Sequence, residues 1–214
     1  MNIIDASVEL LPGQESGESM LRRIELAGRT CYKSGHDITD MSCHSFAQRM
    51  IDNGHAVVLE HASLSMRIIC DRGVSHELVR HRLASYCQES TRYCNYSRNK
   101  FGNQITVVKP SYFKEGMPQY NLLYSIWYSA SANAEAAYFD LLARGLSAQE
   151  ARCVLPMSLK TEVVMTANLR EWRHFLAQRT ARGAHPQMRE VATRALELAQ
   201  EICPPVFKDI IPEA

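Results

Sequence analysis

Segments with strand and with helix periodicity follow one another along this chain in an irregular order, and that order restricts its fold class most. Residues 62–69 alternate apolar and polar side chains, as a half-buried strand does. Residues 118–145 repeat apolar side chains at the spacing of one helix face. Further strands are predicted over 2–10, 105–108 and 161–166, and further helices over 19–27, 40–53, 75 to about 80, 147–156, 168–179 and 186–202. Because regular βαβ repeats are missing, we expect an α+β fold in which helices flank a largely antiparallel, twisted sheet.

The size and composition are those of a globular chain with a core of its own. The chain has 214 residues, of which 46% are apolar and 22% charged, ordinary values for a soluble domain. No internal repeat, low-complexity tract or long linker interrupts it, so we expect residues 1–214 to form a single domain. No apolar run approaches the roughly 20 residues of a membrane-spanning helix, and the first residues lack a signal-peptide pattern. We expect no membrane partner.

The seven cysteines are scattered along the chain, without a C-x-x-C pair. An odd and scattered set argues against a disulfide framework and against a zinc ribbon. We therefore expect free thiols, a cytoplasmic location and no bound metal.

Positive charge is concentrated in two stretches, although the formal net charge of +1 indicates no polyanionic partner such as a nucleic acid. Residues 72–100 contain six basic residues and only two acidic ones. A second cluster consists of Arg170, Arg173, His174, Arg179, Arg182 and His185, with Arg152 upstream. Guanidinium groups suit phosphates and the acceptor-rich edges of nucleobases and flavins. The two clusters predict pockets for compact anionic ligands, while a solvated helix face stays open for the second one.

Within the first cluster, Arg80, His81 and Arg82 are consecutive. On a helix such neighbours point about 100° apart, so they cannot share one solvated face. Their arrangement indicates several anionic or dipolar partners. The chain has no G-x-G-x-x-G and no Walker loop, so a nucleotide must be held by arginines and polar side chains. It also lacks the motifs G-x-S-x-G and H-E-x-x-H, and their absence argues against a hydrolase and against a zinc protease.

Residues 80–93 carry the most specific pattern: Arg-His-Arg, seven residues, Ser90, one residue, then Arg-Tyr. This pattern resembles the signature of the flavin-dependent thymidylate synthases. Supporting matches follow in the family's order, at Gly54-His55 with Glu60-His61, Ala151–Pro156, Asn168-x-Arg170, Phe175–Arg179 and His185-x-Gln187.

The resemblance implies a homotetramer with active sites where subunits meet. It also implies bound FAD, NADPH as reductant, 5,10-methylenetetrahydrofolate as carbon donor and dUMP as acceptor, giving dTMP. The residues that it assigns to FAD are His55, Val57, Arg80, His81, Arg82, Gln88, Asn168, Arg170 and His174. Those that it assigns to the nucleotide are Glu77, Leu78, Val79, Arg80, Gln88, Glu89, Ser90, Thr91, Arg92, Arg152 and Arg179.

Two of these residues are catalytic candidates, Arg179 and Ser90. The uracil C5 must become enolate-like before it accepts a one-carbon unit, and Arg179 matches the family arginine that polarises the uracil ring. A preorganised cation of this kind stabilises the developing negative charge. An alcohol without an adjacent base stays protonated at neutral pH, so we expect Ser90 to hydrogen-bond the nucleotide rather than attack it. Cys87 could supply a thiolate, but we expect a buried apolar role.

Other side chains near the motifs have structural interpretations. We expect Glu60 and His61 to form a structural hydrogen-bonding pair, and Trp127 and Trp172 to pack in cores. Trp172 could instead flank a ring system.

Two alternatives to thymidylate synthesis stay open. The same fold could methylate UMP or a modified pyrimidine nucleotide. Basic residues interleaved with Tyr86, Tyr93 and Tyr96 are also typical of a single-stranded nucleic-acid-binding module.

Overall fold

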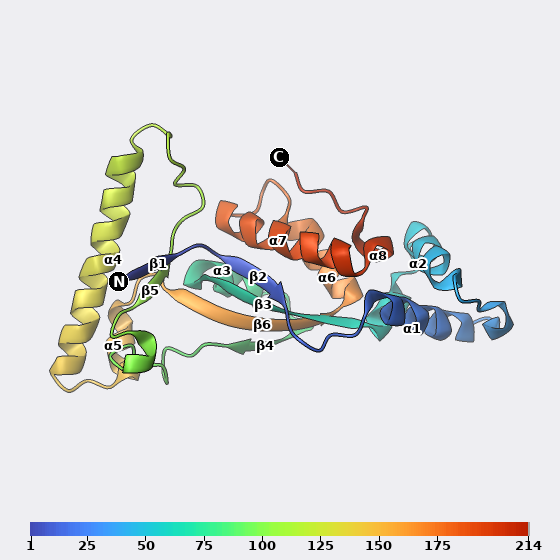
Figure 1. Ribbon diagram of the computed structural model, residues 1–214, viewed down its shortest axis with the longest axis horizontal. Coiled ribbons are helices and arrows are strands. Elements are labelled where there is room, and N and C mark those ends of the chain that lie inside the picture. Colours follow the sequence, from blue (N-terminus) through green and yellow to red (C-terminus); the bar gives the residue numbers. More distant parts are fainter. Residues whose placement is uncertain (214) are drawn as a thin grey trace. The chain divides into compact units, whose positions relative to one another are not determined.

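The computed structural model describes residues 1–213 and has the α+β architecture that the sequence predicts, with an antiparallel sheet and helices (Figure 1). The strands are β1 (Asn2–Ile4), β2 (Ser7–Leu10), β3 (Ser63–Asp71), β4 (Ala84–Gln88), β5 (Thr106–Val108) and β6 (Lys160–Asn168). The α-helices are α1 (Gly17–Thr30), α2 (Ser42–Asp52), α3 (Arg72–Leu78), α4 (Tyr120–Ala143), α5 (Ala148–Ala151), α6 (Leu169–Arg179), α7 (Pro186–Ile202) and α8 (Pro204–Phe207). Short 3₁₀ helices are η1 (Gly35–Asp37), η2 (Ala56–His61), η3 (Asn99–Phe101) and η4 (Arg152–Val154).

The main sheet has four strands in the order β2-β3-β6-β4. In β3 every second side chain is buried, including Leu64, Met66 and Ile68. The same alternation continues along β6, which confirms the two-residue periodicity read from the sequence. The short strands β1 and β5 form a separate pair that runs parallel, with Ile3 opposite Val107.

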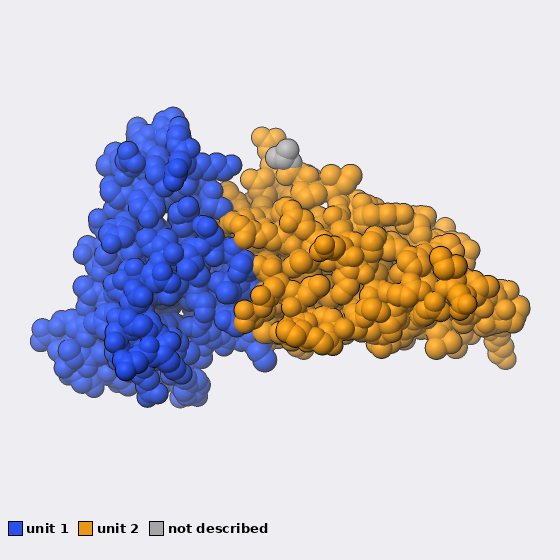
Figure 2. Space-filling model, in the orientation of Figure 1, with its two compact units in different colours: residues 1–7, 68–79, 87–163 blue, residues 8–67, 80–86, 164–214 orange. Residues whose placement is uncertain are grey.

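The chain divides into two compact units (Figure 2). Unit 1 comprises residues 1–7, 68–79 and 87–163, and unit 2 comprises residues 8–67, 80–86 and those from 164 onward. The single domain expected over 1–214 stays a prediction. Among residues 1–213, no helix combines the length and the apolar character that crossing a bilayer requires.

The core of unit 1 forms around two tyrosines. Tyr96 and Tyr138 lie 5.8 Å apart between ring centroids and are buried with Ile105, Val107 and Leu159. Burial raises the pKa of the Tyr138 hydroxyl, which accepts the backbone N–H of Tyr96 at 3.4 Å. Tyr138 therefore anchors the long helix α4 in this core.

The core of unit 2 is helical. The buried side chains of α7 lie on one face, and they include Met188, Val191, Ala192, Ala195, Leu196 and Ala199. The first residue of α1, Gly17, packs directly on the end of α7, since a Cβ there would lie 1.7 Å from the Ile202 carbonyl oxygen. Only glycine permits this close approach.

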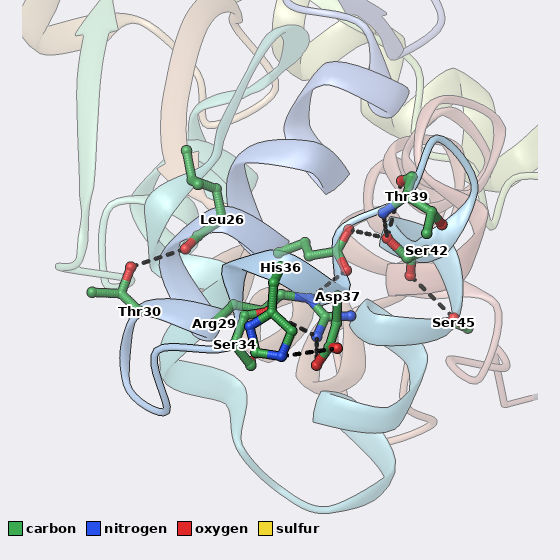
Figure 3. Close-up of polar contacts among 10 residues, drawn as sticks. Leu26, Arg29, Thr30, Ser34, His36, Asp37, Thr39, Ser42 and Ser45 are labelled. Carbon is green, nitrogen blue, oxygen red and sulfur yellow. Dashed lines mark hydrogen bonds and ion pairs between the residues drawn. The ribbon is translucent and has the colours of Figure 1, made fainter.

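A buried ion pair organises the connection between α1 and α2 (Figure 3). Glu25 is buried, and its carboxylate accepts from Arg29 Nε at 2.7 Å and from the Ser42 hydroxyl at 2.8 Å. Arg29 also reaches Asp37 Oδ2 at 3.2 Å. Because Glu25 is buried, the loss of Arg29 would leave its carboxylate buried without a compensating charge.

Three sequence expectations need correction. The helix expected from 75 to about 80 begins at Arg72 instead, because Asp71 Oδ1 caps it by accepting the Val74 N–H at 2.7 Å. It ends at Leu78, so Arg80, His81 and Arg82 do not lie on a helix. The strand expected over 2–10 is two strands, and β4 was missed altogether. β4 is at the edge of the sheet and none of its side chains is fully buried, so it carries no apolar alternation.

Candidate functional site

In unit 2, one member of the predicted flavin set is a buried histidine, His81, in the segment that follows α3 in the chain. His81 is only 6% exposed. Arg179, at the end of α6, donates from Nε to His81 Nε2 at 3.0 Å. On the other side of the ring, His81 Nδ1 lies 3.4 Å from Glu171 Oε1. The structure thus brings together His81 and the arginine expected to polarise uracil, and adds Glu171, which the sequence analysis missed.

The surroundings of the His81 imidazole favour its neutral form. Burial lowers the pKa of His81, and the positive charge of Arg179 lowers it further. The negative charge of Glu171 acts in the opposite direction but does not reverse the shift. The ring packs edge-on against Phe175, with 5.0 Å between ring centroids. The packing thus fixes the ring, and the lowered pKa favours an uncharged imidazole that accepts from Arg179.

A cavity of about 370 Å³ lies beside this cluster, around the first turns of α6. It is lined by Glu60, Leu83, Asn168, Arg170, Glu171 and His174. Asn168 caps the helix by accepting the Glu171 N–H at 2.8 Å, and the i, i+4 spacing sets Arg170 and His174 on one helix face. Three residues of the predicted flavin set therefore share one cavity.

The chemistry of this lining fits an anionic, ring-bearing cofactor such as the predicted FAD. The Asn168 amide and the Arg170 guanidinium lie at the N-terminal end of α6, where the helix dipole favours negative charge, and the His174 imidazole follows one turn later. The carboxylates of Glu60 and Glu171 also line the cavity. Arg170 Nη1 pairs with Glu60 Oε1 at 2.6 Å, but both side chains are about half exposed, so the pair is weak enough to exchange for a ligand.

The other members of the predicted flavin set do not line this cavity. His55, Val57, Arg80 and Arg82 are exposed residues of unit 2. Gln88 belongs to unit 1, where its amide donates to the Ser75 hydroxyl at 3.0 Å and to the Thr161 hydroxyl at 3.2 Å.

In unit 1, the predicted nucleotide residues follow β4 in a turn. The Ser90 carbonyl accepts the N–H groups of Tyr93 and Cys94, and the Ser90 hydroxyl accepts the Arg92 N–H at 3.2 Å. The turn lies against α5 and η4.

Two guanidinium groups flank this turn. Arg152 Nη1 donates to the Thr91 hydroxyl at 3.4 Å, and Arg92 Nε donates to Gln149 Oε1 at 3.0 Å. Two exposed guanidinium groups thus lie beside a Ser-Thr pair, an arrangement that suits a phosphate. Gln149 carries no chemical signature, and only the capping box at Ser147 and Glu150 indicates the helix that presents it.

The Glu89 side chain has other partners in unit 1. Its carboxylate accepts from Lys160 Nζ at 2.6 Å and from the Tyr96 hydroxyl at 3.1 Å. Both partners and Glu89 line a cavity of about 220 Å³ together with Asn2, Lys100, Phe101, Gln104 and Thr106. The sequence analysis missed Lys160, because its role depends on the pairing of β4 with β6.

Glu77, Leu78 and Val79 close α3. Leu78 is fully buried, so only its backbone could reach a ligand. Val79 is partly exposed.

Residues 16–205 match the sequence profile of the family described as thymidylate synthase complementing protein. The chain belongs to this family. Proteins named flavin-dependent thymidylate synthase from Mycolicibacterium gilvum (strain PYR-GCK), Mycobacterium avium (strain 104) and Mycobacterium tuberculosis (strain ATCC 25618 / H37Rv) are each 35% identical to it. Each alignment spans 204 residues and covers 87% of this chain and 78% of the relative.

Ser90 and Cys87 are the two candidate nucleophiles of the signature segment. In the described part of the chain, no histidine or carboxylate hydrogen-bonds the Ser90 hydroxyl, so Ser90 has no base that would activate it as a nucleophile. The buried role expected for Cys87 is wrong, because this residue is exposed on the edge strand β4.

The structure also shows the surroundings of Trp172 and of Glu60. Trp172 packs in the core and donates from Nε1 to the Leu64 carbonyl at 2.9 Å, as expected for a core residue. The expectation of a hydrogen-bonding pair between Glu60 and His61 is wrong, since Glu60 pairs with Arg170.

Residues 1–213 contain two groups of side chains of the metal-ligand type. They are Glu18 with Cys43 and His44, and His81 with Glu171 and His174. A guanidinium lies within 3.0 Å of each group, from Arg22 on Glu18 and from Arg179 on His81. Positive charge at that distance disfavours a cation at either place.

Proposed function

We propose that this chain is a flavin-dependent thymidylate synthase, which reductively methylates dUMP to dTMP with 5,10-methylenetetrahydrofolate as carbon donor and NADPH as reductant. The observation that carries the proposal is the α6 cavity, where Asn168, Arg170 and His174 of the predicted flavin set lie together. The names of the relatives, at 35% identity, support the same reaction.

We assign FAD to the residues that line or adjoin this cavity. Asn168, Arg170 and His174 would hold its polar groups, and Arg80, Arg82, His55, Val57 and Gln88 complete the predicted set. When bound, FAD supplies the redox chemistry that links NADPH oxidation to methyl formation. The protein contributes donors of fixed orientation, and Phe175, which itself packs against Trp172, supports the His81 ring.

We assign the phosphate of dUMP to the turn after β4. Arg92 and Arg152 would pair with it, and the hydroxyls of Ser90 and Thr91 would hydrogen-bond it. A guanidinium binds a phosphate through parallel N–H donors, which fixes the position as well as the charge. The remaining members of the predicted set are Glu77, Leu78, Val79, Arg80, Gln88 and Glu89.

Arg179 is the proposed catalytic group. Its guanidinium is held through Nε by His81, which limits its motion before the substrate arrives. Placed against a uracil carbonyl, it would stabilise the negative charge that develops as C5 becomes nucleophilic. Preorganised donors of this kind contribute roughly 10²–10³ in rate. Ser90 is a binding group in this scheme, because no base accompanies it.

We also propose the homotetramer that the resemblance implies. In support, α4 is 24 residues long but buries only Ser131 and Tyr138, and it exposes Leu122, Ile126 and Tyr128. An exposed apolar helix face is typical of an interaction surface. Light scattering of the purified protein would test this assembly, and a monomer would contradict it. The cytoplasmic location also stays a prediction.

The visible absorption spectrum of the purified protein tests the main proposal. We expect an oxidised flavin band that NADPH bleaches, and dTMP formation from dUMP but not from UMP. Turnover of UMP would support the alternative methylase. A colourless protein that binds single-stranded nucleic acid, with an affinity that falls steeply with salt, would overturn the proposal.

A further inference from the structure

Three side chains of unit 2 are in contact in a row: His81 accepts a hydrogen bond from Arg179 and lies at ion-pair distance from Glu171. Glu171 and His81 are buried, at 7% and 6% exposure. The atoms in contact are Glu171 Oε1 with His81 Nδ1 at 3.4 Å, and His81 Nε2 with Arg179 Nε at 3.0 Å. Glu171 belongs to none of the residue sets that the sequence resemblance assigned.

The contact with Arg179 shows which nitrogen of His81 accepts in this structure. A guanidinium Nε in a protein always carries its hydrogen and has no acceptor capacity. His81 Nε2 must therefore be the unprotonated, accepting nitrogen. In a neutral imidazole the hydrogen then lies on Nδ1, the nitrogen that is 3.4 Å from the Glu171 carboxylate. A single tautomer satisfies both contacts.

Glu171 itself is held in place from several sides. It lies in the first turn of α6, where the helix dipole stabilises a carboxylate, and its backbone N–H is capped by Asn168. The backbone of His81 is fixed as well, because its carbonyl accepts the Tyr86 hydroxyl at 2.7 Å. His174 and Phe175 contact the ring edge-on. The Glu171 carboxylate and the Arg179 N–H therefore act on the two ring nitrogens of His81, and both favour the hydrogen on Nδ1.

We propose that Glu171 is a positioning residue that fixes the Nδ1-protonated tautomer of His81, and that His81 in turn orients the Arg179 guanidinium through Nε2. The role of Arg179 rests on the proposed function, but the tautomer does not. Without an acceptor at Nδ1, the hydrogen is free to move to Nε2, where it faces the Arg179 N–H. Two donors then oppose each other, and the guanidinium turns away.

The test compares Glu171→Ala with Glu171→Gln. The glutamine keeps a carbonyl oxygen that accepts from Nδ1, whereas alanine removes it. Glu197→Ala and Glu197→Gln are matched controls, since Glu197 is an exposed glutamate of α7. All proteins are labelled with ¹⁵N-histidine, and His81→Gln identifies the His81 signals. The imidazole nitrogen shifts then report which nitrogen carries the hydrogen.

We expect the Nδ1–H tautomer in the wild type, in Glu171→Gln and in both controls, and its loss in Glu171→Ala. The kcat/KM for dUMP should fall roughly 10²-fold in Glu171→Ala, as a small misplacement of a catalytic group does, and should recover largely in Glu171→Gln. An Nε2–H tautomer in the wild type, or an unchanged tautomer in Glu171→Ala, would overturn the proposal. If Glu171→Ala fails to fold, the wild type and Glu171→Gln decide it, since both must show Nδ1–H. A wild type that shows Nδ1–H but forms no dTMP would contradict the proposed function alone.

Discussion

The Arg152 guanidinium meets the Thr91 hydroxyl at 3.4 Å, across 61 residues of sequence. This contact joins the helical turn after α5 to the turn that carries Ser90. It groups cationic and hydroxyl donors on one surface of unit 1, which is what a phosphate monoester requires.

We expect Arg152→Ala to raise the KM for dUMP and to leave kcat nearly unchanged. A charge-assisted hydrogen bond contributes about 1.5–3 kcal/mol, so the KM should rise roughly 10- to 100-fold. Steady-state kinetics with varied dUMP would measure the effect. Arg144→Ala removes a guanidinium that is exposed at the end of α4 and serves as the control. An unchanged KM for Arg152→Ala would remove this residue from the phosphate site.

Arg179→Ala should abolish most dTMP formation while the protein still binds FAD. The loss should be roughly 10²–10³ in kcat, the usual cost of one preorganised donor. Flavin content from the absorption spectrum and dTMP formation are measured on the same preparation. Arg23→Ala, on the exposed surface of α1, should retain both. Full turnover by Arg179→Ala would refute electrostatic activation by this residue.

The buried Glu25–Arg29 pair should dominate the stability of the α1–α2 connection. Arg29→Met leaves the Glu25 carboxylate buried without its partner, and the free energy of unfolding should fall by about 3–5 kcal/mol. Arg22→Met removes a half-exposed pair with Glu18 and should cost about 0–1 kcal/mol. Urea unfolding of both variants would measure the difference. Equal losses in the two variants would show that burial of the Glu25 pair carries no special weight.

His81 should make the protein less stable at acidic pH. Its pKa is lowered in the folded state by burial and by Arg179, so the unfolded chain binds the proton more readily. Unfolding then takes up a proton, and stability falls as the pH drops through about 6.5, the ordinary histidine pKa. The groups that face the ring are Glu171, His174, Arg179 and Phe175.

Urea unfolding at pH 7 and pH 5 checks this pH dependence. The stability loss between the two pH values should be smaller in His81→Gln than in the wild type. His36→Gln changes an exposed histidine and should keep the wild-type difference. The interpretation fails if His81→Gln loses as much stability as the wild type.

Much of the fold could be read directly from local patterns. Helix α7 begins and ends where it was predicted, at 186 and 202, because Pro186 starts a helix well and Pro204 cannot continue one. β3 and β6 were found because each buries one face. β4 was missed, since an edge strand pairs through its backbone and leaves its side chains without a periodic pattern.

The candidate site was predictable only where its residues belong to a sequence motif. Residues with a distinctive motif, such as His81, Asn168 and Arg170, were found from the sequence. Glu171, Gln149 and Lys160 were not, because an isolated glutamate, glutamine or lysine has no local signature. Their roles come from partners that are distant in sequence, as for Lys160 with Glu89, 71 residues away.

The sequence by itself determined the family, the residue types available for chemistry and most of the helices and strands, because these follow from short-range order and from motifs. Only the tertiary structure decided which partner each charged group meets. His81 and Arg179 are 98 residues apart, and their contact forms only when α6 packs beside the segment that follows α3. Hydrogen-bond geometry, burial and the resulting pKa shifts depend on such long-range packing, which no local pattern specifies.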